Sequence, residues 1–273
     1  MQNGFNMKNN KLFCFGCSYT SYKWKSWADY LSNYYESSDI CGMGGTGNIA
    51  IFDNVIATMD DIREGDTVVV QWSGLLRDDK FIDGDWISEG DPFISPYYSN
   101  DYLKKYFSIE QKIKEFINYH TVLKNIFKYK KVNYKYFFML NPLLKFNNIF
   151  LYGEPLNVGI TLDSLESSLY EIRRYQTENF VNNKPLYDTL ISIVNDNNDS
   201  YIRESLWEYQ SKNQKEDNYL DDGSVDYHAT SLTHLNYLKD HILPYLGKYM
   251  DEDVYNNLKQ ISIKEDFKFK KII

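Results

Sequence analysis

Three residues, Ser18, Asp226 and His228, have the types and surroundings that nucleophilic catalysis needs. Ser18 stands in GCSYT (16–20), directly after an apolar run, while Asp226 and His228 stand in VDYHATS (225–231). A serine is a weak nucleophile until a base takes its proton, and that base is usually a histidine oriented by a carboxylate. In a loop, a carboxylate two residues before a histidine can reach Nδ1 and leave Nε2 free. We therefore expect Ser18 to be a nucleophile, His228 its base and Asp226 the orienting group.

The other histidines of the chain are weaker candidates for the base. The sequence holds four histidines: His120, His228, His234 and His241. His120 and His241 fall in helical stretches whose neighbours give no orienting pattern. Asp-x-His in a polar loop is common, and it equally suits a solvated turn that caps a helix. The interpretation of Asp226 and His228 as catalytic residues is therefore supported only by the order of the motifs along the chain.

The elements expected around these residues alternate between strands and helices. Apolar runs predict strands at 11–15, 67–72 and 134–140, and helical spacing predicts helices at 24–35, 48–62 and 102–129. This alternation indicates a parallel sheet with crossover helices, which is an α/β fold. Ser18 would then lie at the carboxyl end of a strand, where ligands and chemistry gather in open α/β folds.

The rest of the chain is less regular. We expect a strand end and glycine-rich loop over 39–47, a long loop over 78–100, helices over 163–180 and 185–194, a last helix from Leu232 to Ile242 capped by Thr230 or Ser231, and a peripheral tail from Glu265 onward. There is no internal repeat and no clear linker. The prediction is one domain over 1–273, with 78–130 and 143–220 as largely helical insertions or lid segments.

Composition narrows the classes of protein that the chain can represent. Its formal net charge of -8 argues against non-specific binding of nucleic acid, because phosphates attract a basic surface. No apolar run is long enough to cross a bilayer, and the N-terminus MQNGFNMKNN lacks the apolar core of a signal peptide. The odd count of three cysteines suits a reducing compartment. We expect a cytoplasmic protein, or one released without the secretory route, with neither nucleic acid nor membrane as a partner; its oligomeric state is left open.

A second motif, formed by Gly42, Gly44 and Gly47, has the spacing of the dinucleotide-binding pattern G-x-G-x-x-G. In a dinucleotide site the loop follows a long first strand, and an acid at the end of the next strand holds the ribose. Here the preceding strand is short, and the next strand ends in Gln71-Trp72-Ser73 without an acid. We rank this interpretation below catalysis by Ser18.

A third motif, Cys14-x-x-Cys17, has the spacing of redox pairs, which sit at helix N-termini. Cys14 falls inside an apolar strand, where a free cysteine commonly acts as a small buried hydrophobic residue. A zinc site would need two further ligands, and Cys41 is the only other cysteine. The interpretation as buried residues is favoured, and we expect no metal and no organic cofactor.

The order of the motifs resembles the SGNH or GDSL hydrolase family, in which four short blocks build one site. GCSYT (16–20) looks like the first block with Ser18 as nucleophile, and GMGGTGN (42–48) looks like the second. Gly45 aligns with the glycine whose N–H contributes to the oxyanion hole in the family. Asp226 and His228 resemble the last block. The resemblance implies a three-layer α/β/α sandwich with a central, mostly parallel sheet.

The third block departs from the family pattern. It normally ends its strand with Gly-x-Asn-Asp, whose Asn completes the oxyanion hole, whereas VVVQWSGLLR (68–77) has Ser73 and Gly74 there. By this resemblance the hole would be built from the Ser18 and Gly45 N–H groups together with Ser73, Gln71 or Asn48. In the same stretch Trp72 and Arg77 follow a WS-x-x-x-R pattern, associated with SGNH-like proteins of phage and surface-polysaccharide loci, and are predicted to bind substrate.

The resemblance implies a serine-dependent ester hydrolase or acyl-transferring enzyme. Four aromatic residues of the middle region are candidates for lining a cleft that takes an O-acylated carbohydrate: Trp86, Tyr97, Tyr98 and Trp207. Packing in the core or in a lid is an equally good interpretation of these aromatic residues. The alternative function is a non-catalytic carbohydrate-binding or structural module that kept the fold after loss of the oxyanion Asn.

Overall fold

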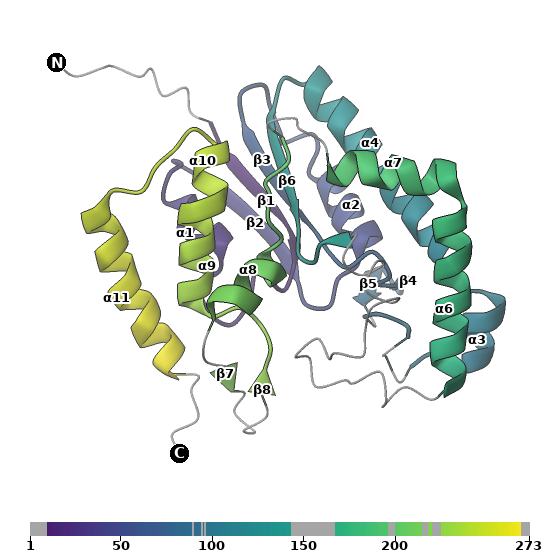
Figure 1. Ribbon diagram of the computed structural model, residues 1–273. Helices are drawn as coiled ribbons and strands as arrows, with labels where there is room; N and C mark the ends of the chain where they lie inside the picture. Colours follow the sequence, from purple (N-terminus) through teal and green to yellow (C-terminus); the bar gives the residue numbers. More distant parts are fainter. Residues whose placement is uncertain are drawn as a thin grey trace.

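The fold is built on a four-stranded sheet whose strands all run parallel (Figure 1). The computed structural model describes residues 10–88, 90–93, 95, 97–142, 167–195, 200–214, 218–219 and 225–268. The strand order is β2-β1-β3-β6, with β1 at Leu12–Cys17, β2 at Ser38–Met43, β3 at Thr67–Trp72 and β6 at Asn133–Phe138. The prediction of an α/β fold with a central parallel sheet is confirmed.

The two central strands, β1 and β3, are buried along their whole length. Successive side chains of a strand point to opposite faces, so Phe13 and Phe15 enter the core on one side of the sheet and Leu12 and Cys14 the core on the other. This double burial explains why their sequences are continuous apolar runs with no polar alternation.

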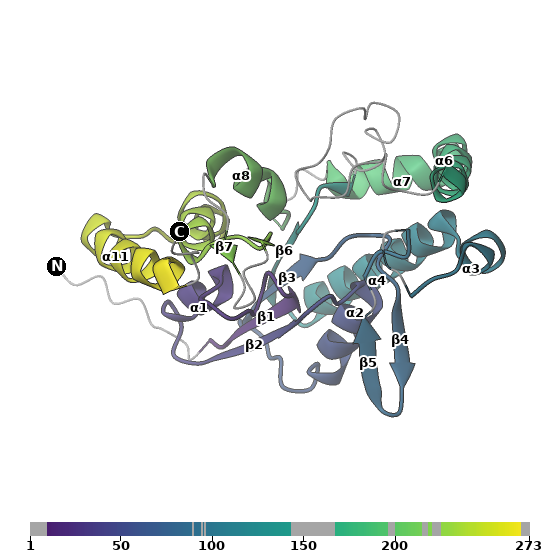
Figure 2. The same ribbon diagram turned by 90° about the horizontal axis from the view of Figure 1, so that it is seen from below.

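Helices cover both faces of the sheet and complete three layers (Figures 1 and 2). One face carries α1 (Trp27–Ser32), α8 (Leu206–Asn213), α9 (Ser231–Tyr237) and α11 (Glu252–Lys268). The other carries α2 (Asn48–Ala57), α3 (Asn100–Lys105), α4 (Ile109–Tyr129), α6 (Ser167–Asn182) and α7 (Lys184–Val194). Among the described helices, none is long and apolar enough to cross a membrane.

A hairpin interrupts the stretch 78–100 that was predicted to be a loop. Strand β4 (Asp79–Ile82) pairs antiparallel with β5 (Asp85–Ser88), and the hairpin projects from the sheet layers in Figure 2. Its turn residues Asp83 and Gly84 have φ angles of 53° and 92°. Asp-Gly is a strong hairpin signal because both central residues of a type I′ turn need positive φ. The sequence therefore contained the signal for this hairpin.

The helix predicted from Leu232 to Ile242 forms, but it is not the last helix as predicted, because α11 follows it. Helix α9 continues without a break into the π-helical turn η2 (Leu238–Ile242) and the short α10 (Leu243–Tyr245). Thr230 is its N-cap, because the Thr230 side chain accepts a hydrogen bond from the Thr233 N–H. Of the two caps predicted, Thr230 is the observed one. A further two-stranded pair, β7 (Asn218–Tyr219) with β8 (Val225–Asp226), precedes this helix.

The prediction that the tail is peripheral from Glu265 onward is wrong for its first residues. Asp266 belongs to α11 and is buried, and its carboxylate accepts hydrogen bonds from the N–H groups of Ser231 (2.6 Å) and Leu232 (3.0 Å). The first N–H groups of a helix have no partner within the helix, so a carboxylate there is stabilising. Helix α11 thus holds the start of α9.

One other predicted helix differs in extent, and one helix was not predicted. Helix α1 is shorter than the predicted 24–35, because Ser26 forms a capping box with Asp29 and starts the helix there. Helix α8 lies in a stretch where no helix was predicted. The part of the predicted insertion over 143–166 lies outside the described residues.

Candidate active site

The carboxyl ends of the parallel strands bring the predicted site segments to one edge of the sheet. Cys17, the last residue of β1, is in register with Met43, the last residue of β2. Ser18 and the glycine-rich loop 44–47 therefore leave neighbouring strands at the same edge. Ser73 follows β3, the strand on the other side of β1. The sheet topology alone groups the first three segments of the predicted site.

A tight turn presents Ser18 directly after β1. The Thr20 N–H donates to the Cys17 carbonyl at 2.8 Å, which places Ser18 inside the turn. Glycine is needed before it, because a Cβ on Gly16 would lie 2.1 Å from Thr20 Oγ1 and 2.8 Å from Gln71 Oε1. Those two atoms form a 2.6 Å hydrogen bond that ties the turn to β3. The small polar cluster after the strand thus serves to fix the serine.

The structure brings Ser18, His228 and Asp226 together in one chain of hydrogen bonds. His228 Nε2 lies 2.8 Å from Ser18 Oγ, although the two residues are 210 positions apart. His228 Nδ1 lies 2.6 Å from Asp226 Oδ1. An ionised carboxylate can only accept, so Nδ1 carries the proton and Nε2 is left to accept from the Ser18 hydroxyl. This is the tautomer that a general base requires.

Asp226 is held in its ionised form. Burial would raise the pKa of its carboxyl, but hydrogen bonds from His228 Nδ1, from the Tyr22 hydroxyl and from the His228 backbone N–H outweigh burial and lower the pKa below its ordinary value. The contact of the Tyr22 hydroxyl with Asp226 Oδ2 is 2.7 Å long. Burial and the carboxylate raise the pKa of Tyr22, so its hydroxyl stays a donor.

Two tyrosines from the segment after β1 flank the imidazole of His228. The Tyr22 ring stacks on it with centroids 3.9 Å apart and an interplanar angle of 20°. The Tyr19 ring packs against it at 5.0 Å. These rings fix the plane of the imidazole, while Asp226 fixes its rotation. No local pattern predicts the contact of Tyr22 with Asp226, because the two residues are 204 positions apart.

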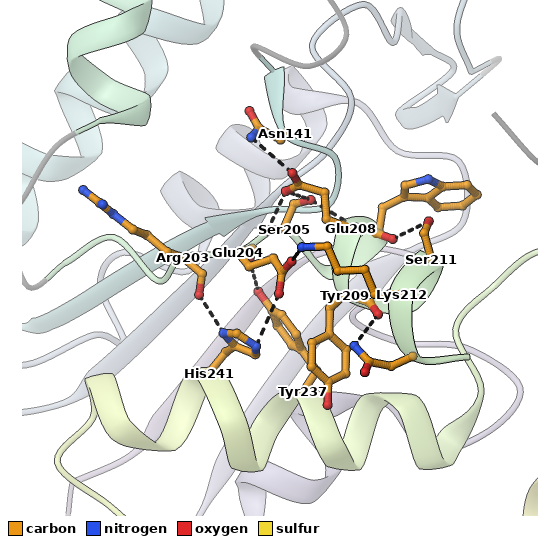
Figure 3. A network of polar contacts seen from close by, with 12 residues as sticks. Asn141, Arg203, Glu204, Ser205, Glu208, Tyr209, Ser211, Lys212, Tyr237 and His241 are labelled. Atoms are coloured by element: carbon orange, nitrogen blue, oxygen red, sulfur yellow. Dashed lines mark hydrogen bonds and ion pairs between the residues drawn. The ribbon is translucent and has the colours of Figure 1, made fainter. Parts of the chain in front are cut away.

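Helix α8 is fixed by a network of polar contacts around its first turn (Figure 3). Ser205 Oγ accepts from the Glu208 N–H, and the Glu208 carboxylate accepts from the Ser205 N–H at 3.1 Å, a capping box. Lys212 pairs with Glu204, and the Tyr209 hydroxyl donates to Asp240 of η2 at 2.7 Å. The Ser-x-x-Glu spacing at 205–208 is the sequence signal that would have found this helix.

From this fixed position α8 supports the loop that carries His228. Gln210 Nε2 donates to the Tyr227 carbonyl at 2.9 Å. The Tyr19 hydroxyl lies within hydrogen-bond distance of the same carbonyl (3.0 Å) and of Gln210 Oε1 (3.2 Å). Gln214 Oε1 accepts from the Thr230 N–H at 2.9 Å. His228 is therefore held through the residues on both sides of it in the chain.

The hairpin β4–β5 holds the glycine-rich loop from the other side. The Asp79 carboxylate accepts from the Gly47 N–H (2.7 Å), the Ala50 N–H (3.3 Å) and Ser88 Oγ (2.7 Å). Ser88 Oγ is also within hydrogen-bond distance of the Gly45 carbonyl, which competes with Asp79 for its single proton. Gly45 itself has a φ of 71°. Asp79 and Ser88 were not among the predicted site residues.

This arrangement argues against dinucleotide binding at Gly42, Gly44 and Gly47. Such a site places a pyrophosphate on the N-terminus of the following helix, here α2. The buried carboxylate of Asp79 already occupies that N-terminus and would repel a phosphate.

The end of β3 contains polar groups that the protein leaves without partners. Asn48 Oδ1 accepts from the Ser73 N–H at 2.9 Å, and Asn48 Nδ2 lies 3.5 Å from the Gly74 carbonyl. Ser73 is fully buried, and its Oγ has no hydrogen-bond partner among the described residues; the same holds for Gln71 Nε2. Asn48 thus links the second predicted block to the third.

The prediction that Trp72 binds substrate is wrong. Trp72 is fully buried and packs edge-on against Phe116 of α4 with ring centroids 5.3 Å apart. Its side chain points to the same face of β3 as Val68 and Val70, into the core between the sheet and α2 and α4. Both faces of β3 are buried, so the sequence could not tell which one a residue near its end would occupy.

Arg77, the other predicted substrate-binding residue, does lie beside the glycine-rich loop. Its Nη1 donates to the Thr46 carbonyl at 3.2 Å, and its Nη2 lies 3.9 Å from Met139 Sδ. Arg77 is half-buried.

The four aromatic residues predicted for a cleft do not share one environment. Tyr98 is buried and packs on Tyr102 at 5.2 Å, which excludes it from a surface. The Trp86 indole donates to Asp53 at 2.8 Å. Tyr97 is exposed, and Trp207 packs against Tyr19 with ring centroids 6.4 Å apart. Of the four, Trp207 is the one joined to the His228 environment by these contacts.

The cysteines behave as buried hydrophobic residues. Cys14 and Cys17 are both fully buried and unbridged, and burial raises the pKa of the Cys14 thiol well above its ordinary value. A protonated buried thiol is a poor redox group. Within the described ranges no group of three or more His, Cys, Asp and Glu residues is placed to hold a metal ion.

No protein-family model and no curated protein matches the chain. Among solved structures, the chain is similar to a member of the lipolytic protein G-D-S-L family from Veillonella parvula, with 8% sequence identity over 93% of this chain and 96% of that one. The TM-score is 0.32. Likeness at this level carries no argument about activity, so any function has to be argued from the site.

Proposed function

We propose that the protein is a serine-dependent enzyme that hydrolyses or transfers acyl groups from esters. The observation that carries the proposal is the continuous hydrogen-bonded chain from Ser18 Oγ through His228 to Asp226. A solvated turn with a capping role would not need this alignment, because Thr230 and Asp266 already cap α9.

In the proposed reaction, His228 Nε2 takes the Ser18 proton as Oγ attacks the ester carbonyl carbon. The carbonyl π electrons move onto oxygen, and Asp226 stabilises the imidazolium that forms. The oxyanion collapses, the bond to the alcohol breaks, and His228 returns the proton to the leaving alkoxide. A water or sugar hydroxyl then gives its proton to His228 and attacks the acyl-enzyme, and collapse of the second intermediate regenerates Ser18.

The proposed oxyanion hole combines the backbone N–H groups of Ser18 and Gly45 with a side chain from the end of β3. Neither N–H contacts an acceptor within the part of the chain that the structure describes. Ser73 Oγ, buried and without a partner, is the best substitute for the missing Asn. Asn48 is less suited, because its amide is engaged by Ser73 and Gly74.

We propose an O-acylated carbohydrate as substrate class, with Trp207 as the aromatic residue that a sugar would meet. Its contact with Tyr19 supports this choice, since Tyr19 packs on His228. The acyl group passes to water or to a sugar hydroxyl in the second half of the reaction, after Ser18 has been acylated.

Ser18→Ala is the test of the proposal. We expect release of 4-nitrophenol from 4-nitrophenyl acetate to fall by roughly 10⁴-fold or more, because the nucleophile is removed. Labelling by a fluorophosphonate probe should be lost as well. Ser21→Ala is the matched control, since Ser21 is an exposed serine in the same segment. Equal turnover by wild type and Ser18→Ala would remove Ser18 from the mechanism.

The second candidate is a non-catalytic carbohydrate-binding or structural module. It is favoured by one observation: Ser73 and Gly74 stand at the end of β3, where the hydrolases carry the oxyanion Asn. The fluorophosphonate probe separates the two functions. Labelling of Ser18 supports the enzyme, whereas a folded protein that stays unlabelled and turns over no ester supports the module.

A further inference from the structure

Arg77 carries a positive charge that no described carboxylate neutralises through an ion pair. A guanidinium has five N–H donors. Those of Arg77 meet a backbone carbonyl, that of Thr46, and the weak acceptor Sδ of Met139. No carboxylate in the described part of the chain forms an ion pair with it, and these two contacts are its hydrogen-bond partners among the described residues.

The guanidinium contacts residues that neighbour Ser18 and Gly45 in the proposed site. Met139 Sδ, which it contacts, is also 3.6 Å from Cys17 Sγ, and Cys17 directly precedes Ser18. Its other partner, Thr46, follows Gly45 in the loop proposed to hold the oxyanion. The Arg77 side chain also packs against Gly74, since a Cβ there would lie 3.8 Å from Arg77 Cγ.

The acidic residues near this position are engaged elsewhere. The Asp79 carboxylate accepts hydrogen bonds from the start of α2 and from Ser88. The Asp226 carboxylate accepts them from His228 and Tyr22. Asp78, the neighbour of Arg77 in sequence, pairs with Lys112 at 2.5 Å.

A half-buried cation without a counter-charge is costly unless something supplies an anion, and arginine matches carboxylates by its planar, two-pronged geometry. We propose that Arg77 binds a carboxylate of the substrate, so that the enzyme selects esters that carry a negative charge close to the scissile bond. This inference rests on the proposed function, and it narrows the substrate from acylated carbohydrate to acidic ester.

The carboxylate can belong to the acyl group or to the alcohol, and two pairs of substrates distinguish these sources. The acyl pair is mono-4-nitrophenyl succinate, which is anionic, against 4-nitrophenyl butanoate, which is neutral. The alcohol pair is 4-acetoxybenzoate against its N-methylamide. Each is measured as kcat/KM with wild type, Arg77→Gln and Arg77→Lys. Arg63→Gln is the matched charge control, because Arg63 is exposed and precedes β3 at the opposite edge of the sheet.

We expect wild type to prefer the anionic member of one pair by tenfold or more. Arg77→Gln should abolish that preference, Arg77→Lys should retain part of it, and Arg63→Gln should keep all of it. Absence of a preference in both pairs would overturn the inference while leaving the esterase standing. A loss of equal size on anionic and neutral esters in Arg77→Gln would also overturn it, since the guanidinium would then act on the oxyanion.

A binding measurement keeps the inference independent of turnover. Ser18→Ala and Ser18→Ala/Arg77→Gln are titrated by NMR with methyl hydrogen succinate, with methyl 4-carboxyphenyl carbonate, and with their neutral methyl esters. Stronger binding of an anionic ligand that depends on Arg77 supports the inference even if wild type hydrolyses no ester, which would sink the proposed function alone. Equal binding of charged and neutral ligands would overturn the inference.

Discussion

The two sides of Ser18 differ in how completely their polar groups are satisfied. On the side of the base, both nitrogens of His228 and both oxygens of Asp226 have partners within 2.6–2.8 Å. On the side of β3, the buried atoms Ser73 Oγ and Gln71 Nε2 have no hydrogen-bond partner among the described residues, and no described carboxylate pairs with Arg77.

This difference indicates a division of labour within the site. A buried polar group that lacks a partner costs about 1–3 kcal/mol, so proteins rarely keep one without a reason. The polar atoms of the His228 and Asp226 side chains all have partners in the protein, which suits the role in proton transfer proposed for them. Ser73 Oγ and Gln71 Nε2 have no partner among the described residues, and Arg77 has no carboxylate partner there, which suits the roles proposed for this side toward an oxyanion and a charged substrate.

The largest effect on turnover is expected from a substitution on the side of His228 and Asp226, where the polar groups are satisfied. Asp226→Asn should lower kcat on 4-nitrophenyl acetate by roughly 10³–10⁴-fold, because an amide in place of the carboxylate favours the wrong imidazole tautomer. The fold should survive, since the amide has nearly the same shape. Circular dichroism is the control for folding, and a loss smaller than tenfold would mean that Asp226 does not orient the base.

A smaller effect on turnover is expected from a substitution at the end of β3. Ser73→Ala should lower kcat by about 10²-fold, the effect of losing one oxyanion donor, with KM little changed. Because Ser73 Oγ has no partner in the described structure, its removal should not lower Tm. A drop in Tm with unchanged kcat would show that Ser73 stabilises the fold and does not act on the substrate.

Tyr22→Phe tests how much the second oxygen of Asp226 contributes. Loss of the 2.7 Å hydrogen bond should lower kcat about tenfold, since hydrogen bonds to charged groups contribute about 1.5–3 kcal/mol. The stacked ring is kept. Without this donor the pKa of Asp226 rises toward its ordinary value. An unchanged kcat would show that Tyr22 acts only by packing.

His234 should make the stability of the protein depend on pH. It is buried and packs against Tyr19, which in turn packs against His228. Burial, with the charge of His228, lowers the pKa of His234 to about 3. Unfolded histidine titrates near ~6.5, so the unfolded state binds the proton first and stability is lost as pH falls from about 6.5 toward 3. His234→Phe should remove up to about 1.4 kcal/mol per pH unit of this loss in urea unfolding, and identical slopes would contradict the prediction.

Much of the fold could be predicted because its signals are local. The runs LFCFGC and TVVVQW predict central strands, since only strands buried on both faces are apolar throughout. The hairpin at 79–88 and helix α8 were missed, although Asp83-Gly84 and the Ser205–Glu208 capping box are local signals for them. Both elements are short and lie in polar stretches of the sequence, which were therefore interpreted as loops.

The sequence by itself determined the candidate nucleophile, the Asp-x-His pair and the glycine-rich loop, because each depends on residues a few positions apart. Only the tertiary structure decided that Ser18 and His228 meet across 210 positions, that Tyr22 holds Asp226, and that Trp72 turns into the core. The physical reason is that these outcomes depend on which strand ends share an edge and on which face each side chain enters. Both are set by packing between distant segments.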